Sequence, residues 1–273
     1  MHYGNTAALF KRELSRFKKT GYRSFPWRGE SDPYHILVSE IMLQQTQTDR
    51  VIAYYLRFIK TFPTSTSLSK ASLKEVLTLW SGLGYNRRAR FLHNAAQKIE
   101  TDFGGSIPHT YEALRSLPGV GEYTANAVLA FAFNKRVLLL ETNIRTVLIH
   151  HFFKHTEKVT DQMLKKVLSS LLPKRGINTW YGLLMDYGAA LKKEVGNKNK
   201  QSTTYKKQKA FKGSEREIRG HNISWLLKTP STKAQLANRV KKELGATKEK
   251  FSLVFEKLLK EGLLKKKGGR VTL

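Results

Sequence analysis

LPGVGEYTANAVLAFAF, residues 117–133, is the stretch that decides the fold. A proline and two glycines, Gly119 and Gly121, come just before an apolar run of Ala, Val and Leu. This order predicts a tight turn between two helices, in which the backbone N–H groups around Leu117, Gly119, Val120 and Gly121 are free to hold a phosphate without reading base sequence. The alternative is an ordinary helical turn that needs glycine only for a positive φ.

The rest of the chain divides by composition into three parts. Residues 1–192 alternate amphipathic stretches with short Pro, Gly and Ser breaks, which predicts an all-α domain. The apolar run 137–141 fits a short strand and a buried connection equally well, and we expect no sheet there. Residues 193–212 are basic and aperiodic, which predicts a linker or a loosely held strap. Residues 213–273 carry three helical patterns and a short β-like end, the order of a winged helix that contacts DNA, holds a partner protein or covers the first domain.

Charge and cysteine content limit the function. The chain has 273 residues and a formal net charge of +28, which attracts polyanions and favours nucleic acid as the partner over a merely basic soluble protein. It contains no cysteine, which excludes disulfides, thiolate zinc sites and cysteine-held iron–sulfur clusters. We expect no membrane span and no secretory signal, and therefore a cytoplasmic protein, nucleoid-associated if the source is bacterial.

The hairpin is followed by LETNIRTVL, residues 140–148, and this order resembles the helix-hairpin-helix superfamily of base-excision DNA glycosylases. Four further segments resemble MutY-type adenine DNA glycosylases: FPWR (25–28), DPYHILVSEIMLQQTQ (32–47), LWSGLGYNRRARFLHNAA (79–96) and MDYGA (185–189). The resemblance implies an all-α helix-hairpin-helix glycosylase fold, with two helical subdomains flanking a cleft, and beside it the small C-terminal winged-helix-like module.

The resemblance also implies a catalytic set. Glu40 would protonate the flipped adenine, since a partly buried glutamate keeps its proton at neutral pH. Glu141 would balance the positive charge on the sugar, although the family has an aspartate there and this side chain is one methylene longer. Tyr123 and Asn143 would support the sugar and the attacking water. Taken alone, Glu40 fits an N-terminal helix carboxylate with Ser39 as the cap, and the alternative for Glu141 is a helix-start residue without a catalytic duty.

Further residues are expected to contact DNA. Trp27 and Arg28 resemble residues that line the base pocket. Tyr85 resembles the family's intercalating tyrosine, whose alternative is a core tyrosine. The remaining expected contacts are the loop Gln44, Gln45 and Thr46 at the lesion, and the basic residues Lys198, Lys200, Lys206 and Lys207 on phosphate.

The expected activity is monofunctional excision of adenine mispaired with 8-oxoguanine or guanine in double-stranded DNA, by a monomer without a cofactor. Tyr123 stands where bifunctional relatives carry a lysine, and a tyrosine cannot form the Schiff base that strand cleavage needs. Lys192 stands about where the first cluster cysteine should be. Two rivals remain: a mismatch thymine or uracil glycosylase, and a catalytically weak protein that binds mismatched DNA.

Overall fold

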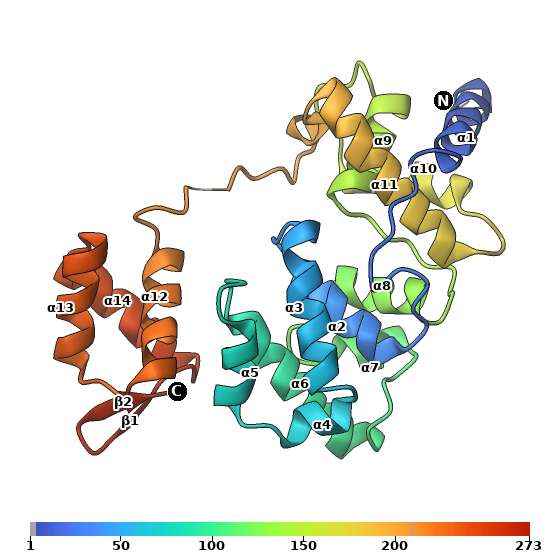
Figure 1. Cartoon of the computed structure of the whole chain (residues 1–273). Coiled ribbons are helices and arrows are strands. Elements are labelled where there is room, and N and C mark those ends of the chain that lie inside the picture. The colour runs from blue at the N-terminus through green and yellow to red at the C-terminus, as the bar shows by residue number, and fades with distance from the viewer. Residues whose placement is uncertain (1–3, 209) are drawn as a thin grey trace. The chain divides into compact units, whose positions relative to one another are not determined.

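The protein was analysed as a computed structural model that describes residues 4–208 and 210–273, and these are mostly helical (Figure 1). The chain folds into two compact units. The first unit comprises Met1–Glu40, His109–Ser116 and Val120–Lys207. The second unit comprises Ile41–Pro108, Leu117–Gly119 and Gln208–Leu273. The chain passes from one unit to the other within the helix Pro33–Leu43 and within the hairpin.

The first unit is built around α9 and α11, which lie side by side in Figure 1. Its helices are α1 (Gly4–Lys18), α7 (Tyr111–Arg115), α8 (Glu122–Phe131), α9 (Thr142–Phe152), α10 (Asp161–Leu171), α11 (Ile177–Val195) and the 3₁₀ helix η1 (Lys198–Gln201). The helix α2 (Pro33–Leu43) begins in this unit and ends in the other. One apolar core joins α1, α8, α9, α10 and α11 and includes Phe10, Val147, Leu168 and Leu184, all fully buried or nearly so.

The apolar connection between α8 and α9 is extended and is not paired into a sheet, as expected. Its polar backbone is satisfied by side chains. The hydroxyl of Tyr181 donates to Val137 O at 2.7 Å and accepts from Leu139 N at 3.0 Å, and Asn126 Nδ2 donates to Leu138 O at 3.2 Å. Because unpaired buried backbone groups cost free energy, these bonds fix the segment that leads into α9.

The second unit contains α3 (Thr48–Thr61), α4 (Ser65–Lys70), α5 (Leu73–Trp80) and α6 (Arg87–Phe103). Two of these short helices start with capping boxes, one between Thr64 and Ser67 and the other between Ser72 and Glu75. Such boxes satisfy the first backbone N–H groups of a helix and set where it begins. The unit's core lies along the buried face of α6, where Leu92 and Ile99 are buried.

The C-terminal module, residues 213–273, confirms the predicted winged-helix order (red and orange in Figure 1). It contains α12 (Glu215–Lys228), α13 (Lys233–Leu244), α14 (Lys248–Lys260), β1 (Lys265–Lys267) and β2 (Arg270–Thr272). The two strands pair antiparallel through Gly268 and Gly269, both with positive φ, which suits a tight hairpin turn. The capping box of α13 is Thr232 with Gln235.

The segment expected to be a linker is partly ordered. Asn199 is 4% exposed, and its Nδ2 donates to Thr142 O at 3.0 Å and to Thr146 Oγ1 at 2.8 Å, which ties η1 to the first turn of α9. Val159 and Ser202 form a parallel β-bridge. The sequence shows no periodicity here because the order comes from side-chain and bridge contacts rather than from a long helix.

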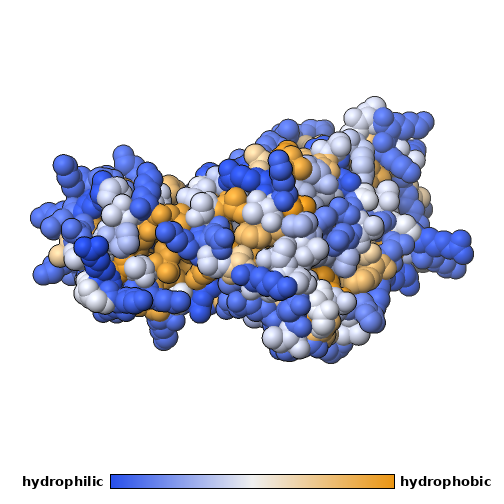
Figure 2. Space-filling view, turned by 60° about the horizontal axis from the view of Figure 1, so that its bottom comes forward, coloured by the Kyte–Doolittle hydropathy of each residue, from blue (hydrophilic) through white to orange (hydrophobic). Residues whose placement is uncertain are grey.

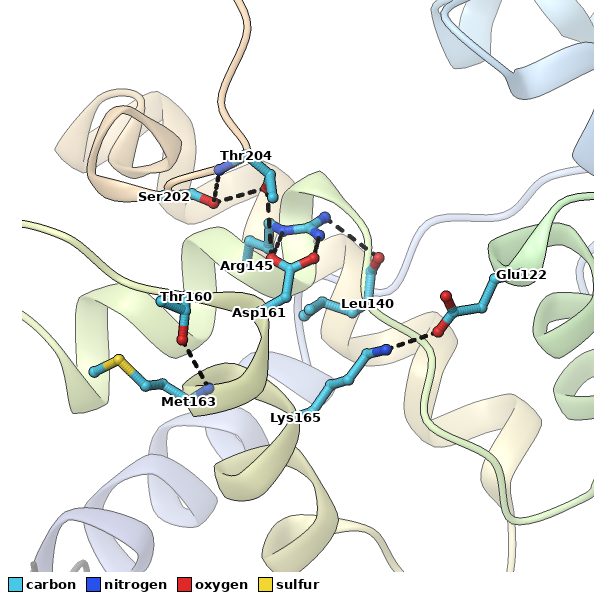
Figure 3. A network of polar contacts seen from close by, with 9 residues as sticks. All are labelled: Glu122, Leu140, Arg145, Thr160, Asp161, Met163, Lys165, Ser202 and Thr204. Atoms are coloured by element: carbon cyan, nitrogen blue, oxygen red, sulfur yellow. Dashed lines mark hydrogen bonds and ion pairs between the residues drawn. The ribbon is translucent and has the colours of Figure 1, made fainter.

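A polar network anchors the same segment to α9 and α10 (Figure 3). Arg145 Nη2 donates to Asp161 Oδ2 at 2.5 Å, and Thr204 Oγ1 donates to Asp161 Oδ1 at 3.4 Å. Lys165 pairs with Glu122 at 2.7 Å and joins α10 to α8. The start of α9 is therefore held from several sides.

The face seen in Figure 2 is mostly hydrophilic, with apolar patches between the polar side chains, in line with the net charge of +28. In the described part of the chain, no helix has the length and apolar character that crossing a membrane would require.

Candidate functional site

Glu40 lies in the last part of α2 and is 7% exposed. Burial raises the pKa of its carboxyl group to about 7, and the negative charge of Glu141 adds to that shift. A hydrogen bond from Tyr123 and the charge of Arg28 act against it. A carboxyl group in this state holds its proton close to neutral pH, which is what a general acid requires.

The alternative in which Ser39 caps a helix that starts at Glu40 is wrong. The helix α2 begins at Pro33, and Asp32 Oδ1 accepts hydrogen bonds from Tyr34 N at 2.7 Å and His35 N at 3.3 Å. Ser39 is inside the helix, where its hydroxyl donates to Ile36 O at 2.9 Å. The helix start therefore does not stabilise the charge of Glu40.

Tyr123 lies in the first turn of α8 and shares a hydrogen bond with Glu40. Burial raises the pKa of its phenol well above the usual 10, and the charges of Glu40 and Glu141 raise it further. The phenol thus stays protonated and acts as a donor to the Glu40 carboxylate.

Glu141 is the N-cap of α9. Its Oε1 accepts hydrogen bonds from Asn143 N at 2.7 Å and Ile144 N at 2.8 Å. Burial raises the pKa of this carboxyl group, while those two bonds and the charges of Arg145 and Lys192 favour its ionised form. Glu141 therefore caps the start of α9, and its negative charge also raises the pKa values of Glu40 and Tyr123.

The MDYGA segment on α11 holds two neighbours of this site. A Cβ added at Gly188 would lie 2.3 Å from the backbone oxygen of Asn143, so only glycine lets α11 approach the start of α9 this closely. Asp186 is 1% exposed and accepts from Arg28 Nη2 at 2.9 Å and from Arg23 Nε at 2.9 Å. The sequence marks this segment by its resemblance but predicts no role for Asp186.

The guanidinium of Arg28 is only partly hydrogen-bonded within the described part of the chain. Its Nη1 is buried without a hydrogen-bond partner among the described residues, and it lies where a Cβ at Gly182 would be, 1.8 Å away. Trp27 is 8% exposed and stacks on Phe25 with ring centroids 5.3 Å apart. Arg28, Glu40, Tyr123 and Glu141 thus influence one another electrostatically within the first unit.

The loop after α2 belongs to the second unit and has a different character. Gln45 is exposed and has φ +55°, and Tyr85 is half-buried and has φ +51°. Side chains other than Gly, Asn and Asp adopt this region at a cost of about 1 to 3 kcal/mol, and such strain collects at functional sites. Tyr85 is half-buried, so the alternative of a fully buried core tyrosine does not hold.

Arg88 holds both strained positions, a role that was not predicted from the sequence. It is 8% exposed, and its Nη1 donates to Ile41 O at 2.8 Å, Met42 O at 2.7 Å and Gln44 O at 2.6 Å. Its Nη2 donates to Thr46 Oγ1 and to Gly84 O, each at 3.1 Å. One guanidinium thus caps the end of α2 and fixes the loop that carries Tyr85. The sequence contains a sign that Arg88 is buried, because it lies on the same apolar face of α6 as Leu92 and Ile99.

The two glycines of the hairpin have different duties. Gly119 has φ +78°, and a Cβ on it would lie 2.6 Å from Phe91 Cβ, so glycine is required there. Gly121 is the N-cap of α8, with extended backbone, and it provides no side-chain cap. Leu117 and Val120 are 2% and 4% exposed, so the hairpin can contact a ligand there only through its backbone.

The four expected phosphate-contacting lysines fall into two pairs. Lys198 and Lys200 lie on η1, which Asn199 anchors to α9. Lys206 and Lys207 are exposed and follow the anchored part of the segment. The structure therefore holds the backbone of the first pair in place and leaves the second pair on the exposed continuation of the chain.

Two helices, α7 and α8, joined by a tight turn with Gly119 at positive φ, define a helix-hairpin-helix protein. The chain belongs to the HhH-GPD superfamily of base excision DNA repair proteins, whose sequence pattern matches residues 38–174. This confirms the expected family and the all-α fold.

Similar proteins of known name agree with the family. The chain is 38% identical over 187 residues to the adenine DNA glycosylase of Buchnera aphidicola subsp. Baizongia pistaciae, a match covering 68% of this chain and 53% of that protein. It is 44% identical over 135 residues to that of Mycobacterium tuberculosis, covering 49% and 44%. The chain thus spans about half the length of the curated relatives it matches. The solved structure of a thermostable thymine-DNA glycosylase is similar with a TM-score of 0.60 at 29% identity, covering 69% of this chain and 88% of that one.

Proposed function

We propose that this chain is a monofunctional DNA glycosylase that hydrolyses the N-glycosidic bond of adenine mispaired with 8-oxoguanine or guanine in double-stranded DNA. The single observation that carries the proposal is Glu40, a buried carboxyl group with a pKa of about 7 beside Tyr123 and within electrostatic reach of Glu141. The names of the relatives in Buchnera and Mycobacterium support adenine as the base.

In the proposed reaction, protonated Glu40 gives its proton to a ring nitrogen of the extruded adenine. The bond between the sugar C1′ and the base then breaks, and its electron pair leaves with the protonated base. Arg28 Nη1, a buried donor without a partner among the described residues, is suited to hydrogen-bond the base. Tyr123 holds the carboxylate that Glu40 becomes.

Loss of the base leaves an oxocarbenium-like sugar, and the Glu141 carboxylate would stabilise its positive charge. Burial raises the pKa of Glu141, while two amides at the start of α9 and the charges of Arg145 and Lys192 favour its ionised form. Water then attacks C1′ and leaves an abasic site. In place of the family's aspartate, Glu141 anchors one oxygen to the helix start, which fixes the position of its longer side chain.

We infer that the enzyme lacks lyase activity and works without an iron–sulfur cluster. Tyr123 offers no amine for a Schiff base at the hairpin. The residues after α11 include no cysteine, so they do not fit the cluster that the fold family implies. Asn199, the Val159–Ser202 bridge and the Arg145–Asp161 pair order this segment instead.

The lysines of the ordered segment are proposed to contact DNA phosphate. Replacing Lys198, Lys200, Lys206 and Lys207 with Gln should lower duplex affinity and reduce the slope of log affinity against log salt by about 0.9 for each lost contact. Unchanged salt dependence would contradict this part of the proposal. Replacing the same number of exposed lysines outside the expected DNA-contacting set, at Lys11, Lys18, Lys19 and Lys174, is the matched control.

The deciding experiment is single-turnover base release from four duplexes, with adenine opposite 8-oxoguanine, adenine opposite guanine, thymine opposite guanine and uracil opposite guanine. The proposal expects release of adenine only, and strand breaks only after alkali treatment. Strand cleavage without alkali, or a product trapped by borohydride, would contradict the monofunctional assignment.

One rival has an observation in its favour. The thymine-DNA glycosylase fold neighbour is 29% identical to this chain, so thymine or uracil release is the second candidate. A purine needs ring protonation more than a pyrimidine does, and Glu40 favours adenine for that reason. Duplex binding without release of any base would instead indicate a mismatch-binding protein.

A further inference from the structure

The segment 197–205 contains η1 and lies against α9 within the first unit. Asn199, in η1, is 4% exposed, and its Nδ2 donates to Thr142 O at 3.0 Å and to Thr146 Oγ1 at 2.8 Å. Thr146 is fully buried, and its hydroxyl donates to the same oxygen of Thr142 at 2.9 Å. One buried amide thus completes a triangle of hydrogen bonds on the first turn of α9.

The triangle lies beside the expected catalytic residues in the chain. Glu141, the N-cap of α9, comes directly before Thr142, and Asn143 comes directly after it. Glu141 Oε1 accepts hydrogen bonds from the backbone N–H groups of Asn143 and Ile144. The carboxylate is therefore tied to the backbone of this first turn, and a shift of the Thr142 peptide moves the carboxylate with it.

The same segment also supports the residue before Glu141 (Figure 3). Arg145 Nη1 donates to Leu140 O at 3.4 Å, and the same guanidinium forms an ion pair with Asp161 at 2.5 Å. Asp161 Oδ1 in turn accepts a hydrogen bond from Thr204 Oγ1 at 3.4 Å. The segment thus reaches the backbone on both sides of Glu141, once directly and once through this chain of contacts.

The position of Glu141 matters because its charge acts on its neighbours. It raises the pKa values of Glu40 and Tyr123, while the charges of Arg145 and Lys192 favour its own ionised form. Such interactions weaken as the charges move apart. A displacement of about 1 Å at a reacting centre can cost about a hundredfold in rate. A contact that fixes this carboxylate therefore acts on the chemical step.

We propose that Asn199 is a positioning residue for the glycosylase reaction, because it fixes the backbone at the start of α9 and thereby holds the Glu141 carboxylate at the reacting sugar. The inference rests on the proposed function. Asn199 acts through Glu141 and does not itself touch the substrate. The turn that carries Lys198 and Lys200 thus serves catalysis through the asparagine between them.

The test compares Asn199→Ala with the wild type in the full chain. Two quantities are measured: single-turnover adenine release against pH at saturating enzyme, and the pKa of Glu40 without DNA, by NMR titration of isotope-labelled glutamate with Glu40→Gln to assign the signal. We expect the maximal rate to fall about tenfold at unchanged duplex affinity. The falling limb of the pH profile and the pKa of Glu40 should both move to lower pH, because the released Glu141 carboxylate moves away from Glu40.

Gln201→Ala is the matched control. Gln201 belongs to the same segment, but its Nε2 donates to Thr156 O at 2.9 Å, beyond the end of α9. The control should lose stability, measured by denaturant unfolding, yet keep the wild-type rate and the wild-type pKa of Glu40. Equal changes of rate and pKa in Gln201→Ala and Asn199→Ala would show that Asn199 is only structural, and would overturn the inference.

A double variant isolates the route through Glu141. Added to Glu141→Gln, the change Asn199→Ala should alter the rate by less than about twofold, because the carboxylate that it positions is already gone. A tenfold loss in that background would contradict the inference. If Asn199→Ala does not fold, Thr146→Val decides, since it keeps the side-chain shape and removes the hydroxyl of the triangle. It should shift the pKa of Glu40 in the same direction, and an unchanged rate and pKa would overturn the inference.

The outcomes separate this inference from the proposed function. Wild-type protein that releases no adenine refutes the proposed activity, while a lower pKa of Glu40 in Asn199→Ala but not in Gln201→Ala still supports the positioning of Glu141. Wild-type protein that releases adenine, with the same rate and the same pKa of Glu40 in Asn199→Ala, refutes the inference and supports the activity.

Discussion

Glu40 and Gln45 come from one short segment, yet their surroundings are opposite. Glu40 is buried within a helix, and its environment changes the proton affinity of its carboxyl group. Gln45 is exposed, and its environment holds the backbone at φ +55° while the side chain stays free to contact a ligand. The comparison teaches that proton transfer needs a dry site, whereas contact with a duplex needs exposed side chains on a rigidly held backbone.

The two regions also differ in what maintains them. Around Glu40, several charged and polar groups shift one another's pKa values, so the effect is shared. Around Gln45 and Tyr85, one buried guanidinium, that of Arg88, makes most of the hydrogen bonds that fix the two loops. Substitutions in the first region should therefore lower the rate of base release, and substitutions around Arg88 should lower stability and duplex affinity.

The largest expected effect follows from Glu40→Gln. The variant keeps the size of the side chain but has no proton to give, so single-turnover adenine release should fall about a thousandfold while duplex affinity changes little. Glu122→Gln, at an exposed glutamate of α8, should retain the wild-type rate. A Glu40→Gln variant with more than about a tenth of wild-type activity would show that another group supplies the proton.

Arg88→Met tests the second region. Removing the guanidinium takes away the hydrogen bonds that it donates to the carbonyl oxygens of Ile41, Met42 and Gln44, so the free energy of unfolding should fall by about 3 kcal/mol. Denaturant unfolding measures this loss, and affinity for mismatched duplex should drop with it. Arg87→Met, at the exposed neighbouring position, is the control; equal destabilisation in the two variants would refute the special role of Arg88.

The pH dependence tests how the carboxylates are coupled. Because burial and the charge of Glu141 raise the pKa of Glu40 to about 7, the general acid is protonated below that pH and loses its proton above it. Single-turnover release should therefore fall by about tenfold per pH unit above about pH 7.

The Glu141→Gln variant tests whether Glu141 contributes to this pH dependence of base release. Removing its charge removes one cause of the raised pKa of Glu40, so the falling limb of the pH profile should move to lower pH, in addition to an overall loss of rate. A limb that stays in place would mean that Glu141 does not act on Glu40 electrostatically.

The smallest expected effect is that of Gln45→Gly. Glycine adopts φ +55° without strain, so the free energy of unfolding should rise by up to about 1 kcal/mol, while affinity for a mismatched duplex falls several-fold. Asn134→Gly is the control, because Asn134 also has positive φ (+50°) and lies outside the expected DNA-contacting set. Loss of stability in Gln45→Gly would argue against stored strain at this loop.

The sequence by itself determined the hairpin, the helical order and the winged-helix-like module, because each depends on local patterns such as LPGVG or the spacing of apolar residues. The candidate carboxylates came from the resemblance to a known family. It also determined that the chain has no cysteine with which to ligate a cluster. The roles of Asp186, Arg88 and Asn199 were decided only by the tertiary structure, since each acts through groups far away in the chain. The raised pKa of Glu40 was likewise decided only by the tertiary structure. Its pKa of about 7 arises from burial together with Tyr123 and Glu141, and no local pattern around residue 40 encodes these neighbours.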